Sequence, residues 1–537
     1  SDLLPLAQFD KETNLLTTAG ACSYELKANN REQSAWLENM LALLDRPGEW
    51  VFDRRQRRVY LWPDEGDAPG EDIIAPILTE MIRVEGEIDE NAQRDTPVRC
   101  LTFRGLRFIH NNRYPWHGQT GLGMQHDWEA HDRPTAAMRL RGASDCAVEA
   151  CHFAHGEGAA IRLDLHAERN RIVGNHIEDL GGAGIVLGGY GPGTKNVNRR
   201  NHIVNNHIHH IGLSVWHAPG IFLWQSGENR VAHNHIHNTP YTGIVCSGRI
   251  QLNPSGKGEC HRTIRWGEVK ALLGEDYTQP RWHDPNAWKH DWDKREPLLH
   301  SRQNVIELND IHNVMEMLGD GNGIYISGAG GGNLVRANHV HECLGKHFAE
   351  GIRCDDDQHE TRIEGNLVRR FAGKTIGICV KGINPIVNNV VACPLSPHTP
   401  QGMIALQVGP LHDMPLQRNI VYATTADHAL YWQKRVKVHG EGPDPLVRDC
   451  DADANLYWNT AAPEQGEAHL AAERAHGVEH HSRCADPLFV DPENGDFTLA
   501  PNSPAREMGI EPLETHRAGL TTEMPFYARA SLATASP

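Results

Sequence analysis

Short runs of alternating hydrophobic and polar residues recur along the middle of this chain. Six segments begin with Asn and reach a Gly-Ile or similar strand start within about a dozen residues, or more in some copies. They begin at Asn175, Asn206, Asn234, Asn309, Asn338 and Asn366, at separations of 31, 28, 75, 29 and 28 residues. Such a period marks stacked units, and short β-branched runs broken by Gly and Asn favour strands and turns over helix pairs. The pattern predicts an all-β fold, a right-handed parallel β-helix.

The repeat also predicts which side chains face inward. The first inward residues of successive strands are Met138, Ile161, Ile185, Ile221, Ile244, Ile324, Ile352, Ile378, Ile404 and Leu430. Two residues later stand Leu140, Leu163, Leu187, Leu223, Cys246, Ile326, Cys354, Val380, Leu406 and Trp432. Period-two alternation places both sets in the core. The repeated Asn residues are predicted to lie at turns and to bond to the next Asn in a ladder.

Histidines recur beside these asparagines, at His176, His207, His209, His235, His237, His339 and His341. They alternate with apolar residues in step with the coil. We therefore expect them to line the outer face of a second strand as part of the scaffold, and we assign no metal ligand.

Parts of the chain outside the repeat suggest further units. Residues 1–47 are predicted to be an N-terminal segment or cap, and 48–95 a small antiparallel β module. The β-helix is expected over 96–485, with a Trp-rich insertion at 249–303 that covers the functional face. Residues 486–537 would form a C-terminal cap and tail, because a solenoid end needs protection from edge-to-edge association.

Charge and composition exclude several classes of function. The formal net charge of −17 argues against nucleic acid and anionic membranes as partners, and no apolar run reaches the length of a membrane span. The 12 Cys form no CxxC motif, so free buried thiols are favoured, although an oxidised pair such as Cys146 and Cys151 stays open. The chain begins at Ser1 rather than Met, as after removal of a leader, and we expect a secreted or periplasmic protein. The oligomeric state is not indicated.

The outward positions of the main strands collect residues suited to a carbohydrate. Phe222, Trp224 and Tyr325 are expected to offer flat stacking surfaces for sugar rings. Arg353 and Lys381 would bind polar or acidic substituents at one end. Two further residues outside these strands are substrate-binding candidates: His217, in the turn before a strand, and Trp116, in a loop that would form the opposite wall.

Two acidic groupings are candidates for catalysis. Asp320 lies between glycines just before a strand, and Asp355, Asp356 and Asp357 follow the strand of the next coil. Glycosidic cleavage needs two carboxyl groups about 5–10 Å apart, a spacing that adjacent coils can supply. Glu350, a substrate-binding candidate, lies close enough in sequence to substitute for either member of the pair. Turn formation and a solvated acidic turn are the structural alternatives.

Several segments resemble right-handed β-helix glycoside hydrolases: residues 34–63, LTFRGLRFIHN, the NHIH coils, GDGNGIYISG, GIRCDDDQ and the DPLFVDPENGDF tail. The nearest family is glycoside hydrolase family 141, with families 120 and 136 more distant. The resemblance implies fucosidase- or xylanase-like activity by two Asp on neighbouring coils, here Asp320 with Asp355 or Asp356. Those families have more coils before the segment that starts at Ser34, where this chain has only about 33 residues.

The sequence therefore predicts a glycoside hydrolase that degrades a polysaccharide or oligosaccharide and needs no cofactor. Two alternatives stay open. One is a polysaccharide lyase, in which the acidic run would hold Ca²⁺ and Arg353 or Lys381 would remove a proton. The other is a non-catalytic glycan-binding protein on the same scaffold.

Overall fold

A computed structural model of the chain forms two compact units, one of Asp2–Ile77 with His117–Gly121 and one that contains Leu78–Trp116 and Leu122–Pro537. The structure describes residues 3–20, 36–64, 66, 73–91, 94–114, 132–248, 263–275, 288–345, 349–356, 358–371, 376–393, 402–407, 411–432 and 446–527, with only the backbone at 288–291. Statements about absence below refer to these residues.

The smaller unit contains two antiparallel hairpins. Strand β1 (Leu6–Asp10) pairs with β2 (Leu15–Thr18), and β3 (Trp50–Asp53) pairs with β4 (Arg58–Leu61), with a 3₁₀ turn at Leu41–Leu43. The β3–β4 hairpin lies in the predicted module, but the predicted boundary at residue 95 is wrong. Strand β5 (Ile82–Glu85) pairs in parallel with β9 (Ala136–Ser144) and so belongs to the larger unit.

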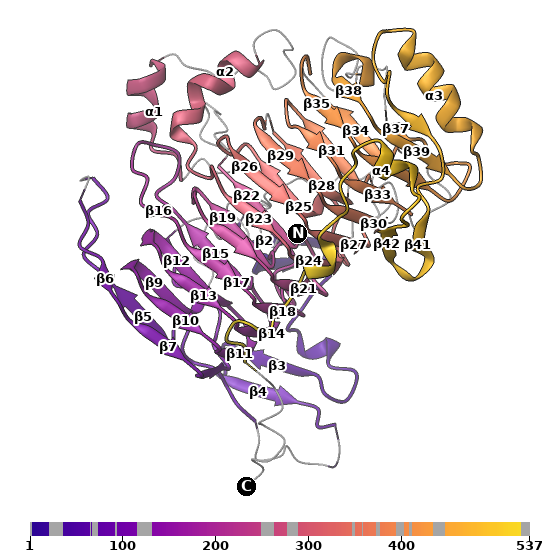
Figure 1. The fold of residues 1–537 in the computed structure, drawn as a ribbon. Helices are drawn as coiled ribbons and strands as arrows, with labels where there is room; N and C mark the ends of the chain where they lie inside the picture. The colour runs from indigo at the N-terminus through magenta and orange to yellow at the C-terminus, as the bar shows by residue number, and fades with distance from the viewer. Residues whose placement is uncertain are drawn as a thin grey trace. The chain divides into compact units, whose positions relative to one another are not determined.

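The larger unit is a parallel β-helix whose described strands stack into three sheets, numbered here in chain order within a coil (Figure 1). Sheet 1 has 13 strands: β5, β6 (Val98–Arg99), β9, β12 (Ala159–Glu168), β15 (Ile185–Gly188), β16 (Asn198–Arg199), β19 (Ile221–Trp224), β22 (Ile244–Ser247), β25 (Gly321–Ser327), β28 (Ala349–Asp355), β31 (Ile378–Lys381), β34 (Ile404–Gln407) and β37 (Tyr431–Trp432). Sheet 2 has 11: β7 (Thr102–Arg104), β10 (Ala147–Glu149), β13 (Arg171–Val173), β17 (His202–Val204), β20 (Arg230–Ala232), β23 (Val305–Glu307), β26 (Asn333–Arg336), β29 (Thr361–Glu364), β32 (Ile386–Val387), β35 (Pro415–Gln417) and β38 (Asp451–Asp453). Sheet 3 has 12: β8 (Arg107–Ile109), β11 (His152–Gly156), β14 (His176–Leu180), β18 (His207–His209), β21 (His235–His237), β24 (Asp310–Val314), β27 (His339–Cys343), β30 (Leu367–Phe371), β33 (Val390–Ala392), β36 (Ile420–Ala423), β39 (Leu456–Asn459) and β40 (Arg483–Cys484).

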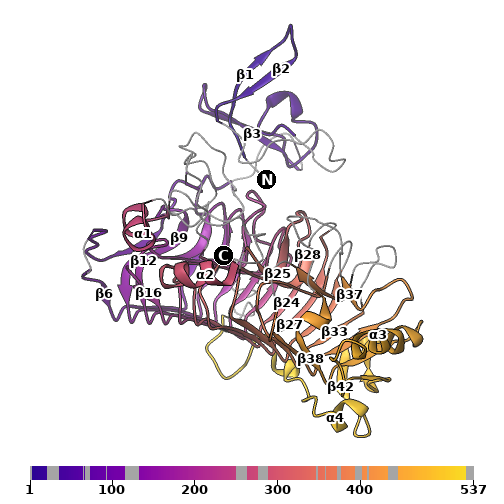
Figure 2. The same cartoon turned by 90° about the horizontal axis from the view of Figure 1, so that it is seen from above.

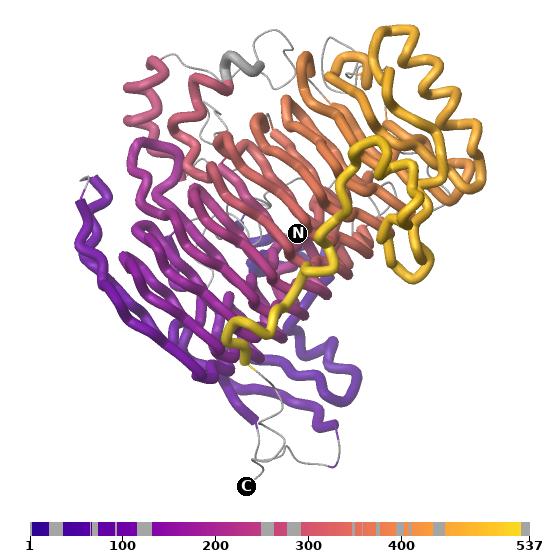
Figure 3. Tube along the Cα trace, viewed as in Figure 1, coloured from indigo at the N-terminus to yellow at the C-terminus, as the bar shows by residue number. Residues whose placement is uncertain are grey.

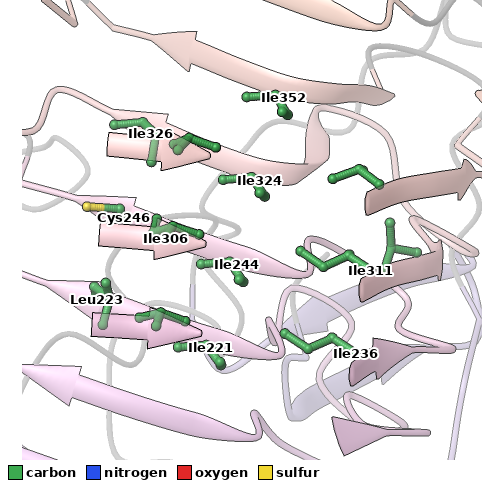
Figure 4. Packing of buried hydrophobic residues seen from close by; sticks show 14 of the residues in the cluster. Ile221, Leu223, Ile236, Ile244, Cys246, Ile306, Ile311, Ile324, Ile326 and Ile352 are labelled. Atoms are coloured by element: carbon green, nitrogen blue, oxygen red, sulfur yellow. The ribbon is translucent and has the colours of Figure 1, made fainter. Parts of the chain in front are cut away.

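Sheet 1 confirms the predicted register at every coil from Met138 to Ile404, because each predicted inward residue pairs with the next. The last coil differs by one residue: Ile404 pairs with Tyr431 rather than Leu430. Leu430 and Tyr431 both point into the core at this bend, so alternation alone does not tell which of them pairs. Figure 4 shows the resulting columns, with Ile221, Ile244, Ile324 and Ile352 in line.

Glycine precedes the inward Ile in several coils because the chain bends there, so that the glycine and the Ile both face the filled core. A Cβ on Gly351 would lie 2.3 Å from Val368 Cγ1 and 2.7 Å from the carbonyl oxygen of Gly377 in the next coil. Gly323 and Gly377 meet core methyl groups at 2.3 and 2.2 Å in the same way. The glycine of the Gly-Ile pair is therefore a packing requirement in these three coils.

The repeated Asn residues form the predicted ladder at the turn between sheets 2 and 3. Asn234 Oδ1 accepts from both the backbone N and the Nδ2 of Asn206, at 3.0 and 2.9 Å. Its own Nδ2 donates to Ile203 O at 3.0 Å and to Asn309 Oδ1 at 2.9 Å. The ladder continues from Asn175 to Asn455, with all of its Asn side chains buried.

The recurrent histidines lie on the outer face of sheet 3, as predicted, because the residue between each pair points inward. In β18, Ile208 belongs to the core while His207 and His209 flank it. Several of them are more buried than a solvent face would be, with His176 and His209 exposed by only 5% and 8%.

The described part of the insertion packs beside the turns at the C-terminal ends of sheet 1 strands and does not lie across the strands themselves. It contains α1 (Trp266–Leu273), α2 (Trp288–Arg295) and a 3₁₀ turn (Glu296–Leu298). His300 Nε2 bonds to Gly193 O at 2.8 Å, and Trp292 Nε1 donates to Ala329 O at 3.4 Å, both in turns that follow sheet 1 strands. Residues 249–262 and 276–287, the rest of the predicted cover, lie outside the described residues.

The C-terminal segment closes the last coils and then runs back along earlier ones. It contains α3 (Glu464–Arg474), the antiparallel pair β41 (Phe489–Asp491) and β42 (Asp496–Leu499), α4 (Pro504–Glu507) and 3₁₀ turns at Val447–Asp449, Pro492–Asn494 and Thr515–Arg517. Figure 2 shows α3, α4 and β42 together at the end of the coils away from β6 and β9. The final stretch, yellow in Figure 3, bonds successively to Leu308, Asn205 and Gly174.

The ten described cysteines are free thiols, including Cys146 and Cys151. None of the helices in the described ranges has the length and apolar character needed to cross a membrane.

Candidate functional site

The aromatic residues predicted as sugar platforms lie on the outer face of sheet 1, but they are buried. Phe222, Trp224 and Tyr325 are exposed by 3%, 0% and 2%, and they pack with Val186 and Val245 in one cluster. The prediction of an exposed stacking surface is therefore wrong. The sequence pattern identifies the face on which a side chain lies, but it does not show what packs against that face.

Of the two substrate-binding candidates outside the main strands, the structure describes only His217. His217 is 8% exposed and packs edge-on against Tyr241, at 5.0 Å between ring centroids. The Tyr241 hydroxyl in turn donates to the carbonyl oxygen of Asp320 at 2.9 Å, so His217 supports the turn that carries Asp320. Trp116 lies outside the described residues.

The structure brings three of the predicted site carboxylates together around Arg353 of β28. Its Nη1 lies 3.3 Å from Asp320 Oδ1 and 3.4 Å from Glu350 Oε2, and its Nη2 lies 2.6 Å from Asp355 Oδ2. Asp320 immediately precedes β25, and Glu350 and Asp355 lie near the two ends of β28, the adjacent strand. Parallel pairing of β25 with β28 thus places residues about 30 positions apart around one guanidinium.

Asp355 is held by donors on both of its oxygens. The Tyr325 hydroxyl donates to Oδ2 at 3.0 Å, beside the Arg353 contact. Lys381 of β31 forms an ion pair with Oδ1, and the backbone N of Asp356 donates to the same oxygen at 2.8 Å. Asp356 itself accepts from Ser327 Oγ at 2.7 Å. Asp355 therefore anchors Arg353 and Lys381 in place, and Asp357 lies outside the described residues.

Glu350 and Asp320 differ sharply in burial. Glu350 is fully buried, and Asn322 Nδ2 donates to its Oε2 at 2.6 Å. The Asp320 side chain is 58% exposed. Asp320 also has φ +57°, a left-handed conformation that Asp and Asn tolerate better than most residues.

Local environment pushes the pKa values of the two buried carboxyls in opposite directions. Burial raises the pKa of Glu350 above its usual value, although Arg353 opposes this shift. Burial also disfavours ionisation of Asp355, but the charges of Arg353 and Lys381 outweigh it and hold the pKa of Asp355 well below its usual range. The cluster therefore combines one carboxyl whose pKa is raised with one whose pKa is lowered.

Five buried polar atoms on this face have no hydrogen-bond partner among the described residues: Trp224 Nε1, Ser247 Oγ, Asn322 Oδ1, Glu350 Oε1 and Arg353 Nε. Pairing across β19, β22, β25 and β28 places them on adjacent strands. Buried polar atoms are normally paired, so a group of unpaired ones calls for a ligand or water. Sugar hydroxyls, which both donate and accept, have the matching chemistry.

Two polar features of sheet 1 were not predicted. Asn322 occupies the position before the repeat glycine, as Glu350 does one coil later, and that shared position was the available signal. At the other end of sheet 1, Asp164 accepts from Arg139 Nε and Arg162 Nε, each at 2.6 Å, and all three are buried. This network is saturated with ion pairs and thus fits a structural role.

Residues 107–253 match the family model of the right handed beta helix region, which confirms the predicted fold class. No curated protein matches the sequence. One similar solved structure, titled "Glycoside hydrolase", is 18% identical with a TM-score of 0.43, over 67% of this chain and 58% of that chain. Another, titled "The complex structure of XylC with xylose", is 13% identical with a TM-score of 0.34, over 74% and 56%. The chain thus spans less than two thirds of either protein, and the resemblance to family 141 stays a prediction.

Proposed function

We propose that this chain is a glycoside hydrolase that cleaves a polysaccharide or oligosaccharide at the cluster around Arg353. The observation that carries the proposal is the contrast beside one guanidinium between Glu350, whose pKa is raised by burial, and Asp355, whose pKa is lowered by Arg353 and Lys381. Hydrolysis of a glycosidic bond requires this combination of one carboxylic acid and one carboxylate.

Glu350 is assigned as the general acid and Asp320 as the nucleophile or base. The proton of Glu350 passes to the glycosidic oxygen as the bond to the anomeric carbon breaks. Asp320 then attacks that carbon or activates the water that does so. Asp320 is preferred over the sequence candidates Asp355 and Asp356 because its side chain is 58% exposed, whereas both oxygens of Asp355 already accept from strong donors. Asp356 accepts from Ser327.

One feature supports a carbohydrate as the ligand. The unpaired polar atoms of Ser247, Asn322 and Glu350 suit hydroxyl groups. A lyase is less well supported, because the Asp355 charge is neutralised by Arg353 and Lys381 and is not free for Ca²⁺. The pKa of Arg353 is raised by its carboxylate neighbours despite burial, so its guanidinium does not act as a base.

The test is product analysis on a panel of defined oligosaccharides with the wild type and Asp320→Asn. Asn keeps the shape and tolerates the same φ, so only the charge is lost. The wild type is expected to release reducing ends, and Asp320→Asn to lose about 10²–10⁴-fold in rate. Asp413→Asn is the matched control, because Asp413 is also exposed at positive φ (63°) but lies outside the cluster.

The alternatives give other products. An unsaturated, ultraviolet-absorbing product would show a lyase, and glycan binding with no cleavage would show a binding protein. Either result, or equal rates for Asp320→Asn and the wild type, contradicts the proposal.

A further inference from the structure

The histidines on the outer face of sheet 3 are paired diagonally between successive strands. The first residue of one strand contacts the third residue of the next. The pairs are His152 Nε2 with Glu178 Oε1 (3.0 Å), His176 Nε2 with His209 Nε2 (3.0 Å), His207 Nε2 with His237 Nε2 (2.9 Å), His235 Nε2 with His312 Nε2 (2.9 Å) and Asp310 Oδ1 with His341 Nε2 (3.1 Å). The row of imidazoles thus has a carboxylate at each end, at Glu178 and at Asp310.

At the Glu178 end, three ligand atoms lie close to one another. His176 Nε2 and His209 Nε2 are 3.0 Å apart, and Glu178 Oε2 lies 3.7 Å from the first and 3.5 Å from the second. Ligand atoms about 2.0–2.1 Å from a tetrahedral Zn²⁺ lie roughly 3.3 Å from one another. Small movements of the two rings would therefore bring all three atoms to the distances of a metal site.

Neighbouring residues hold these ligand atoms in position. Glu178 turns its second oxygen, Oε1, to His152 Nε2 at 3.0 Å, and His209 Nδ1 lies 2.8 Å from His210 Nδ1. A partner on the far atom of each ligand is what orients ligands in metal sites. The ring of His207 stacks on His176 at 5.0 Å between centroids, and its ligand atom lies within 4.8 Å of those of His176 and His209. His207 is thus placed to act as a fourth ligand.

The Asp310 end is less suited to a cation. His339 accepts from Arg369 Nε at 2.9 Å, which places a guanidinium beside Asp310, His339 and His341. A permanent positive charge at this distance opposes binding of a second cation. The carboxylate at the Glu178 end pairs with imidazoles instead.

We propose that His176, His209 and Glu178 form a binding site for a divalent transition metal ion of the Zn²⁺ type, with His207 beside it. Two imidazoles and one carboxylate suit Zn²⁺ and similar metals better than Ca²⁺ or Mg²⁺, which prefer oxygen ligands. The site joins β14 to β18 on sheet 3, whereas the cluster around Arg353 lies on sheet 1. The metal would therefore stabilise the coils and take no part in the reaction, and this revises the expectation of no metal ligand.

The experiment measures Zn²⁺ binding to the full chain, prepared without a polyhistidine tag and stripped with a chelator. Calorimetric titration near pH 7 gives the stoichiometry and Kd, and Co²⁺ gives the visible spectrum of a tetrahedral site. Glu178→Gln and His209→Gln each remove one ligand atom. His341→Gln is the matched control, because it removes an imidazole from the Asp310 end of the same row.

The proposal predicts one tight Zn²⁺ site, weakened by about 100-fold or more in Glu178→Gln and His209→Gln and unchanged in His341→Gln. Saturating Zn²⁺ should also raise the melting temperature of the wild type and of His341→Gln, but not of the other two variants. The same circular dichroism spectrum in all four proteins excludes misfolding as the cause. No binding by the wild type, or binding that Glu178→Gln and His209→Gln leave intact, would overturn the proposal and leave the row as a hydrogen-bonded part of the scaffold.

Discussion

The Asn ladder makes a quantitative prediction for Asn234→Ala. This change removes the acceptor of two buried donors, the backbone N and the Nδ2 of Asn206, and the donor to the carbonyl oxygen of Ile203. Each buried polar group left unpaired costs about 1–3 kcal/mol. With three such groups, we expect a loss of at least ~3 kcal/mol in local stability, even if the coil relaxes.

Hydrogen exchange by mass spectrometry measures this loss where it occurs. Each 1.4 kcal/mol corresponds to about a tenfold change in an equilibrium constant, so peptides that cover residues 203–209 should exchange roughly 100-fold faster or more. Coils are stacked and contact mainly their neighbours, so the effect should fall off toward both ends of the β-helix.

Asn502→Ala is the matched control, because Asn502 lies exposed in a turn outside the ladder. It should leave exchange at residues 203–209 unchanged. Equal exchange in Asn234→Ala and Asn502→Ala would refute the conclusion that the ladder stabilises the turns.

Two other predictions follow from the bend glycines and from Glu350. Gly351→Ala places a Cβ within 2.3 Å of Val368 Cγ1, so we expect a fall in soluble yield and in melting temperature. Gly267→Ala is the control: this glycine has open space around it in α1, so the substitution should be neutral or slightly stabilising. Equal melting temperatures for the two variants would contradict the packing argument. As the acid, Glu350 is active while protonated, so on the alkaline limb of the profile kcat/KM should fall as the pH rises through the raised pKa of Glu350. Arg353→Met removes a charge that lowers the pKa of Glu350, so the alkaline limb of the pH profile should move to higher pH. The control Arg362→Met, at an exposed position, should leave this limb in place. An unmoved limb in Arg353→Met would show that Glu350 is not the group that titrates.

The fold was largely predictable because its constraints are local and periodic. Alternation fixed the inward column from Met138 to Ile404, and the Asn repeat marked the turns. The prediction is wrong at Leu430 because two consecutive residues face the core there. Strand β5 was misassigned because four residues carry too little pattern to separate a first coil from a hairpin.

The candidate site was predictable in its location but not in its roles. Sequence spacing predicts that Asp320, Glu350 and Asp355 lie on adjacent coils. The pKa of Glu350, however, is raised by burial, and burial depends on what packs across sheet 1. The same limit explains why Trp224 was expected to be exposed. The sequence contains His-x-His at His207–His209 and again, one coil later, at His235–His237. In a parallel sheet this spacing places the first His of one strand diagonally opposite the second His of the next strand, as His207 and His237 are. That spacing was the signal for a ligand cluster on sheet 3.

The central claim, that Glu350 donates a proton while Asp320 acts as nucleophile or base, is tested most directly by changing the leaving group. An aryl glycoside whose phenol leaves readily needs little help from an acid, whereas a sugar leaving group needs it fully. The rates of both substrates are measured for Glu350→Gln and Asp320→Asn, with Glu479→Gln as control, because Glu479 is also buried with a pKa raised by burial but lies outside the cluster. The account predicts that Glu350→Gln loses about 10²–10⁴-fold on the oligosaccharide and far less on the aryl glycoside, while Asp320→Asn loses on both and Glu479→Gln on neither. Oligosaccharide turnover by Glu350→Gln at the rate of Glu479→Gln would contradict it.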